Sequence, residues 1–457
     1  MRTVWRAICL GAFRGAYIGG VAVIMKFIHN LVVIDLKNDD GDMLLANGIN
    51  GFVDLIHGKE RIVIEKWLKA EEIIPAEEEE RELFHSLEKR QYFLTAEEED
   101  TIKKQIIEQL KKRSLKKEPD SAWFVLTYRC NFHCPYCYES TVKREKTMTV
   151  EMIDKVFEVH PKLQHIGFFG GEPFLPENRE LIEYIVRKAP KAEYYAITNG
   201  FYLEEYMDLL QSVQFTNIQV TLDGTEKNHN ETRFEKKGQP TYVKILSGIQ
   251  TCLSADIPIT IRMNLSSENY EDLVREKAII QSTEWGKKAA FEIQPLFQCG
   301  KDEQNLLYEK LLKQDQKGKP GANQILTKMP PLSNFLYSGK RLRPILRACD
   351  PEGVNRFYDP FGNIYNCILA VGQATKAVGT YYPEFRLKEK SFLTRDITQI
   401  KKCRTCKNAL FCGGGCPNGI TGEDIYSPNC YNFYNEIENM IPAIFRLRQE
   451  RMKEKAD

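Results

Sequence analysis

The sequence carries almost no net charge, no low-complexity segment and no long apolar run. Its 64 Lys and Arg residues balance 63 Asp and Glu residues, which leaves a formal net charge of +1. This balance excludes the strong basic field with which proteins attract nucleic acids or anionic membranes, so we expect neither partner. The 42% of hydrophobic residues is enough for a sizeable core. The length of 457 residues predicts two to four domains.

The first 24 residues are apolar and basic but lack a convincing export signal. Arg2, Arg6 and Arg14 occur without any acidic residue, and Arg14 interrupts an apolar run that is too short to span a bilayer. We interpret residues 1–24 as a non-native start extension or a disordered segment, with Met25 as the natural start.

Cysteine is the residue type with an unusual distribution. Of 13 cysteines, three lie between Cys130 and Cys137 and seven between Cys349 and Cys430. Clustered cysteines with short spacings form disulfides, zinc sites or iron–sulfur clusters. The size of the chain and the lack of a convincing export signal make disulfides the weakest of these options.

The N-terminal part, residues 25–112, predicts a small α+β unit of the winged-helix type. Its last helix opens with a capping box formed by Thr95 and Glu98 and extends to about Lys112. The other expected elements are a strand at Leu31–Asp35, its hairpin partner at Asp42–Ala46, helices at Asn50–His57, Arg61–Ala70 and Glu77–Lys89, and a short strand at Tyr92–Leu94.

The middle part, residues 122–300, alternates strands and amphipathic helices. Six such βα units predict an α/β fold with a parallel sheet that curves into a partial (β/α)6 barrel. A Lys- and Pro-rich bridge follows at residues 301–345, and a cysteine-rich domain at residues 346–457 ends in a helix at about Asn432–Lys453. The expected strands are Trp123–Leu126, His165–Phe169, Tyr194–Ile197, Asn217–Leu222, Ile257–Asn264 and Ala290–Phe297.

The first cysteine group has the spacing CxxxCxxC and directly follows the first expected strand of the βα series. Reactive groups gather at the carboxyl ends of strands in parallel α/β folds. Cys130, Cys134 and Cys137 can hold three irons of a cubane cluster and leave the fourth iron open to a small ligand. The alternative is a zinc site, which needs a fourth ligand such as His133.

With Tyr136 just before its last cysteine, this group resembles the signature of the radical S-adenosylmethionine (SAM) superfamily. The resemblance implies a [4Fe–4S] cluster, SAM bound to the open iron through its amine and carboxylate, and a 5′-deoxyadenosyl radical that abstracts hydrogen from the substrate.

Further motifs follow the later strands in turn: Gly-Gly-Glu-Pro, Thr-Asn-Gly, Thr-Leu-Asp-Gly, Arg-Met-Asn, and a Gln and a Leu two residues apart. Each could be an ordinary turn, but five in register with successive strands are hard to obtain by chance. The resemblance implies that they cradle SAM. The implied SAM-binding residues are Tyr136, Gly170, Gly171, Glu172, Pro173, Thr198, Asn199, Asp223, Arg262 and Leu296. No catalytic acid or base can be named.

The second cysteine group has the pattern CX12GX4C, then CxxCx5Cx3C and a final cysteine, which resembles the SPASM domain of radical SAM enzymes that modify peptides. The resemblance implies two auxiliary [4Fe–4S] clusters. The implied ligands are Cys403, Cys406, Cys412 and Cys430 for an outer cluster, and Cys349, Cys367 and Cys416 for an inner cluster with one ligand missing from the set. Cys299 is a candidate for that ligand, although a buried thiol is the expected role of both Cys299 and Cys252. A zinc ribbon is the alternative for residues 403–416.

Auxiliary clusters provide an exit for a second electron, which favours net two-electron oxidation of a substrate. The N-terminal pattern resembles the precursor-recognition element of maturases of ribosomally made peptides, in which a leader peptide adds a strand to a sheet edge. An unrelated cap domain is the alternative.

We therefore expect a peptide maturase that binds a precursor through residues 25–112 and forms a cross-link, with a thioether favoured over a C–C bond. A flavodoxin or ferredoxin would supply electrons, and the clusters predict a reduced compartment, hence the cytoplasm. The alternatives are a sulfatase maturase that makes formylglycine and a cluster-based redox sensor.

Overall fold

The computed structural model describes most of the chain and divides it into two compact units. The described residues are 17–18, 21–22, 25–115, 119–142, 145–296, 303, 305–307, 309–310, 331–338, 342–348, 356–420 and 424–454. The predictions for Cys299 and Cys349, for most of residues 1–24 and for most of the bridge lie outside this set. Strands β1 (Tyr17–Ile18) and β2 (Val21–Ala22) form a short antiparallel pair.

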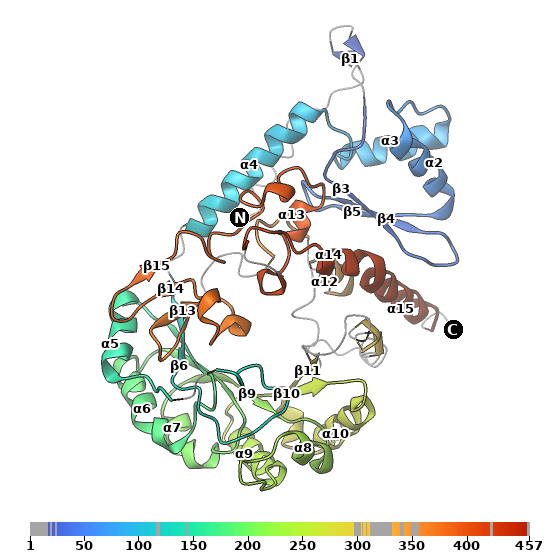
Figure 1. The fold of residues 1–457 in the computed structure, drawn as a ribbon. Coiled ribbons are helices and arrows are strands. Elements are labelled where there is room, and N and C mark those ends of the chain that lie inside the picture. Colours follow the sequence, from blue (N-terminus) through green and yellow to red (C-terminus); the bar gives the residue numbers. More distant parts are fainter. Residues whose placement is uncertain are drawn as a thin grey trace. The chain divides into compact units, whose positions relative to one another are not determined.

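The first unit contains a three-stranded antiparallel sheet and three helices (Figure 1). Trp67 and Tyr92 are both almost fully buried, and the Tyr92 hydroxyl donates a hydrogen bond to the carbonyl of Leu45 at 3.0 Å. The predicted α+β character of this unit is confirmed. Its elements are β3 (Leu31–Asp35), β4 (Met43–Asn47), β5 (Val53–Ile56), α2 (Gly58–Lys69), α3 (Glu78–Lys89) and α4 (Ala96–Leu115).

The predicted helix at Asn50–His57 is wrong, because β5 occupies this stretch and pairs with β4. A tight turn reverses the chain before it: Asn47 Oδ1 accepts from the backbone N–H of Ile49, and Asn50 Oδ1 accepts from that of Phe52. Gly51, with a φ of +78°, supplies the left-handed conformation that the turn requires. Asn50 and Gly51 therefore form a turn and do not begin a helix.

Thr95 and Glu98 form the predicted capping box of α4. Each backbone N–H donates to the other side chain, at 3.0 and 3.2 Å. The short strand expected at Tyr92–Leu94 is reduced to one isolated bridge between Phe27 and Phe93.

The second unit is built on a ten-stranded sheet in the order β11-β10-β9-β8-β7-β6-β12-β13-β14-β15. Its first six strands in chain order are all parallel, and their positions agree with the predicted strands to within two residues at most ends. They are β6 (Ser121–Val125), β7 (His165–Phe169), β8 (Glu193–Thr198), β9 (Phe215–Thr221), β10 (Ile259–Leu265) and β11 (Ala290–Pro295).

Helices between these strands lie along the outer side of the curved sheet (Figure 1). They are α5 (Val150–Val159), α6 (Arg179–Lys188), α7 (Met207–Ser212), α8 (Glu226–Thr232), α9 (Tyr242–Ser254) and α10 (Tyr270–Ser282). This arrangement confirms the predicted α/β core with its parallel sheet. Cys252 in α9 is fully buried, as expected for a structural thiol.

The cysteine-rich C-terminal part extends this sheet at β6. Strand β12 (Phe357–Tyr358) pairs in parallel with β6, and the predicted turn at Asp359–Gly362 joins it to β13 (Asn363–Tyr365). Gly362 has a φ of +84°, and its N–H donates to the Asp359 carbonyl at 3.1 Å. The remaining elements are β14 (Gly379–Thr380), β15 (Arg386–Leu387), α12 (Pro331–Ser338), α13 (Ala409–Cys412), and a C-terminal helix made of α14 (Tyr431–Asn435), a π-helical segment (Glu436–Met440) and α15 (Ile441–Glu454).

Among the described residues, no helix combines the length and apolar character needed to cross a bilayer.

Candidate active site

The CxxxCxxC loop leaves the carboxyl end of β6, where the predicted motifs of the later strands also lie. The backbone N–H of Phe132 donates to Cys130 Sγ at 3.4 Å, and the side-chain amide of Asn199 approaches the same sulfur at 3.8 Å. Asn199 also donates to Asn131 Oδ1 at 2.8 Å. The Thr-Asn-Gly motif after β8 therefore supports the cysteine loop directly.

The glycines after β7 allow that strand end to pack against the cysteine loop. Gly170 and Gly171 have φ values of +87° and +51°. A Cβ at Gly171 would collide with the backbone of Tyr128 and Arg129, just before Cys130. The Gly171 N–H donates to Glu139 Oε2 at 2.8 Å, and Glu139 is only 6% exposed. Glu139 is not among the predicted site residues, and it ties the far end of the loop to β7.

Glu172 connects the ends of β7 and β8 through hydrogen bonds. Its carboxylate is fully buried and accepts hydrogen bonds from the Thr198 hydroxyl and the Asn199 N–H, both at 2.7 Å, and from the Phe174 N–H at 2.9 Å. Burial raises the pKa of Glu172 to about 7, against the opposing effect of these hydrogen bonds. The motif glutamate thus organises the cradle through its neighbours; its contact with SAM stays a prediction.

A polar network joins the cysteine loop to β9 and β10. The Tyr136 hydroxyl donates to Asp223 Oδ2 and accepts from Arg233 Nη1 at 2.7 Å. The other Asp223 oxygen accepts from the Asn264 N–H at 3.0 Å. His229 is fully buried and accepts from the Asp223 N–H through Nδ1, while burial keeps its pKa well below the usual value, so the ring is neutral.

Arg262 on β10 forms an ion pair with Glu292 on β11, with a distance of 2.9 Å between Nη1 and Oε1. Its Nε donates to Asn264 Oδ1 at 3.2 Å. The guanidinium is therefore held in place by its strand neighbours. Leu296 lies just beyond β11, and its N–H donates to the Leu265 carbonyl at 2.8 Å.

The three loop thiols suit a cubane cluster better than a single ion. A structural zinc site needs four ligands and this loop supplies three thiols, whereas a cubane takes one thiolate at each of three irons and leaves the fourth iron open. Burial raises the pKa of the Cys130 thiol to about 12, so its proton would leave only when metal binds.

The C-terminal cysteines sit on short, tightly turned loops. Within the described residues, Cys367 follows β13, Cys403 ends a 3-10 turn, Cys412 ends α13, and none of the described cysteines is in a disulfide. Arg395 is 3% exposed and holds the Cys412–Cys416 loop in place through hydrogen bonds. Its guanidinium donates to the carbonyls of Gly414, Gly415, Ile425 and Ser427 at 2.7 to 3.0 Å.

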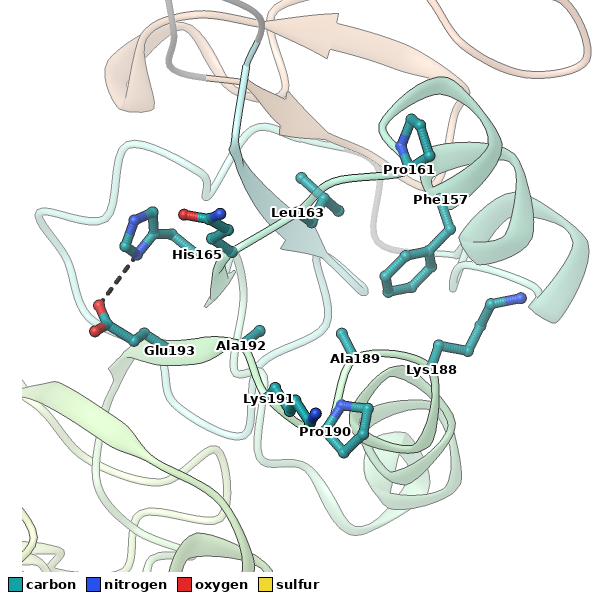
Figure 2. A pocket seen from close by; sticks show the side chains of 11 residues that line it. Phe157, Pro161, Leu163, His165, Lys188, Ala189, Pro190, Lys191, Ala192 and Glu193 are labelled. Carbon is teal, nitrogen blue, oxygen red and sulfur yellow. Dashed lines mark ion pairs between the residues drawn. The ribbon is translucent and has the colours of Figure 1, made fainter.

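A pocket of about 520 Å3 lies away from these motifs, at the amino ends of β7 and β8. Figure 2 shows His165 and Glu193 on one side of it and Phe157 and Lys188 on the other. His165 Nδ1 and Glu193 Oε2 are 3.1 Å apart. Because the cofactor motifs follow the carboxyl ends of the strands, this pocket is not the predicted active site.

Residues 124–276 match the sequence profile of the radical SAM superfamily. This chain has a radical SAM domain. The radical SAM domain makes the chain an enzyme whose cofactors include SAM and a [4Fe–4S] cluster.

Curated relatives of the radical SAM domain carry out different reactions. A Methanocaldococcus jannaschii protein named as a glycyl-radical enzyme activating enzyme is 33% identical over 23% of this chain and 40% of its own length. The GTP 3',8-cyclase of Clostridium acetobutylicum is 28% identical over 34% and 52%. The sporulation killing factor maturation protein SkfB of Bacillus subtilis is 24% identical over 34% and 38%. This chain thus matches about half or less of each relative, and these matches do not select a substrate.

Solved structures share the fold over a longer stretch. The structure of anSMEcpe with bound AdoMet has a TM-score of 0.54 at 18% identity and covers 74% of this chain and 96% of its own. The structure of Streptococcus suis SuiB bound to S-adenosylmethionine has a TM-score of 0.50 at 12% identity and covers 88% and 98%. The SuiB fold therefore has counterparts for a larger part of this chain.

Proposed function

We propose that this protein is a radical SAM maturase that binds a ribosomally made precursor peptide and oxidatively cross-links it, with a thioether as the favoured bond. The proposal assigns Cys130, Cys134 and Cys137 to the SAM-binding cluster and the seven C-terminal cysteines to two auxiliary clusters. A low-potential flavodoxin or ferredoxin would deliver the electrons.

The observation that carries the proposal is the sheet edge at β5. The sheet order is β3-β4-β5, and no further strand pairs with β5 among the described residues. Leu55 is 38% exposed and the preceding Phe52 is 40% exposed. An unpaired edge with apolar side chains can take an extended peptide as an additional strand, with main-chain hydrogen bonds for affinity and side-chain contacts for specificity.

A thioether is favoured because the inner cysteine set is one thiolate short. Cys349, Cys367 and Cys416 provide three ligands for four irons, so a substrate cysteine can occupy the remaining position. The reaction balances when one hydrogen atom leaves a substrate carbon, the thiol loses its proton, and one electron passes to the auxiliary centre as the C–S bond forms.

The chain's own residues orient and isolate this reaction. Glu172, Thr198 and Asn199 fix the strand ends beside the cysteine loop, and Asp223 holds Tyr136 across it. When bound, SAM and its cluster supply the 5′-deoxyadenosyl radical that takes the hydrogen atom. Holding these groups in one buried position supplies orientation that free reactants lack.

The maturation protein SkfB among the relatives supports a peptide substrate. Formylglycine formation stays the second candidate, because the SuiB and anSMEcpe structures share the fold alone with this chain. A redox sensor would have no use for the SAM motifs or for a peptide-binding edge.

The test is co-expression with any short cysteine-containing peptide that is found encoded beside the gene, followed by anaerobic reaction with SAM and a strong reductant. We expect the peptide to lose two hydrogens for each bond and to lose thiol reactivity toward iodoacetamide, with release of 5′-deoxyadenosine. The Cys130→Ala/Cys134→Ala/Cys137→Ala variant serves as the inactive control. Conversion of a sulfatase-derived cysteine peptide to formylglycine, with no change in the neighbouring peptide, would select the second candidate.

A further inference from the structure

Arg233 is a buried cation inserted into the cysteine loop. It follows α8, is 6% exposed, and donates from Nη1 to the Tyr136 hydroxyl at 2.7 Å. Its guanidinium carbon lies 5.7 Å from the centre of the Phe132 ring. Phe132 and Tyr136 both belong to the CxxxCxxC loop, so this charge is held among the residues that separate the three cysteines.

Within the described part of the chain, Arg233 reaches a carboxylate only indirectly, because its Nη1 donates to the Tyr136 hydroxyl, which donates to Asp223. Its buried Nε has no hydrogen-bond partner there. Arginine does not lose its proton in proteins. A buried charge with only an indirect counter-ion is unfavourable, so an anion that binds beside the loop after folding would stabilise it.

The groups around Arg233 indicate where that anion binds. The Asp223 carboxylate already accepts hydrogen bonds from Tyr136 and Asn264. The Glu172 carboxylate accepts three hydrogen bonds from residues at the ends of β7 and β8. Arg233 acts electrostatically on both of these carboxylates and also on the thiols of Cys130 and Cys134, which belong to the loop that it contacts. These thiols become thiolates when metal binds.

We propose that Arg233 is the counter-ion of the cluster held by Cys130, Cys134 and Cys137 and raises its reduction potential. Accepting one electron makes the cluster more negative by one charge, while no bond forms or breaks. A fixed cation in a low-dielectric site stabilises that more negative state more than the oxidised state. Arg233 thereby makes the cluster easier to reduce for its electron donor. The inference rests on the proposed cluster ligands.

The test is a redox titration of the reconstituted full-length protein without SAM, followed by electron paramagnetic resonance. The signal absent from the Cys130→Ala/Cys134→Ala/Cys137→Ala variant identifies the first cluster. Arg233→Gln removes the positive charge, and Arg233→Lys retains the charge without the planar guanidinium group. Arg187→Gln is a matched control, because the Arg187 side chain is 65% exposed on α6. At one fixed potential, we expect Arg233→Gln to lower the reduced-to-oxidised ratio of the cluster about tenfold, equal to about 59 mV for one electron. The lysine variant and the control should titrate like the wild type.

Each other outcome has a defined meaning. A wild-type potential in Arg233→Gln overturns the proposal, and if SAM binding is weakened instead, the anion is the SAM carboxylate. If Arg233→Gln fails to assemble the cluster, assembly in Arg233→Lys at the wild-type potential supports a requirement for positive charge. Failure of Arg233→Lys as well overturns the proposal, because the shape of arginine is then what matters. Absence of the cluster from wild-type protein would instead defeat the proposed function.

Discussion

The hydroxyl of Tyr128 lies 3.1 Å from the carboxylate of Asp359, although 231 residues separate them in sequence. The same carboxylate oxygen accepts from the Tyr365 hydroxyl at 3.2 Å. Tyr128 stands two residues before Cys130, and Tyr365 stands two residues before Cys367. One fully buried carboxylate therefore connects a cysteine loop of the radical SAM domain to a cysteine loop of the C-terminal part.

Tyr128→Phe should lower the free energy of unfolding by about 1.5 to 3 kcal/mol, the usual contribution of a hydrogen bond to a charged group. Asp359→Ala should cost more, because it leaves both tyrosine hydroxyls and the N–H groups of Phe361 and Asn363 without their acceptor. Anaerobic denaturant unfolding measures both effects. Tyr195→Phe is the control, since the structure gives the Tyr195 hydroxyl no hydrogen bond among the described residues; an equal loss there would contradict the assignment.

Glu172→Gln should reduce 5′-deoxyadenosine formation at least tenfold, or about 1.4 kcal/mol in the barrier, while the iron content stays unchanged. In the variant, one carboxylate oxygen becomes an NH2 group, which cannot accept a hydrogen bond. It would face either the Thr198 hydroxyl or the Asn199 N–H, both of which donate to Glu172. Product release and iron are measured on the same preparation. The exposed Glu180→Gln provides the matched control, and loss of iron together with activity would assign Glu172 to folding alone.

Arg395→Met should remove roughly one third of the iron, corresponding to one of the three proposed cubanes. The substitution leaves the carbonyls of Gly414, Gly415, Ile425 and Ser427 without their donor, and the loop between Cys412 and Cys416 loses its shape. Iron analysis and Mössbauer spectroscopy report the loss. Arg386→Met on exposed β15 should keep full iron, and full iron in Arg395→Met would be evidence against this role.

Leu55→Lys should weaken precursor binding at least tenfold without changing SAM cleavage in the absence of peptide, since β5 belongs to a unit separate from the SAM motifs. Fluorescence anisotropy with a labelled precursor measures the affinity. Ile74→Lys is the control, because Ile74 is 68% exposed in the same unit but lies outside the sheet. Equal affinities for the two variants would exclude β5 as the docking edge.

Glu436 should give the stability of the protein a pH dependence. Its side chain accepts from the Ser333 N–H at 2.7 Å, and burial raises its pKa from 4.5 to about 7. The folded state therefore binds the proton more tightly than the unfolded state, and this stabilisation is lost as pH rises toward and through 7. Relative to Glu436→Gln, the wild-type melting temperature should fall between pH 5 and pH 8. A constant difference across this range would show that Glu436 titrates normally.

The order of elements was predictable because its signals are local. Apolar runs alternate with amphipathic helices between residues 122 and 296, and each parallel strand appears where its run occurs. The cysteine ligands could be proposed for the same reason, since most of their spacings are two to five residues, and their role as ligands stays a prediction. The short strand β5 was missed because four residues give no clear periodicity, whereas the Asn and Gly turn before it decides its direction.

The supporting residues of the site were not predictable, because their partners are distant in sequence. Arg233 reaches Tyr136 across 97 residues, and Glu139 reaches Gly171 across 32. No motif marks either residue. Their roles follow only from the way the strands bring the carboxyl ends together.

The parallel pairing of β6 with β12 also affects how the chain is made. Strand β6 ends at Val125 and β12 begins at Phe357, so the ribosome must add the whole intervening segment before this edge can be covered. At the usual synthesis rate, this takes about 12 to 46 seconds. During that time, the apolar strand SAWFV presents an open edge, which is a template for aggregation. Slow or truncated synthesis should therefore deposit this protein in inclusion bodies, and yields should improve when translation is fast relative to self-association.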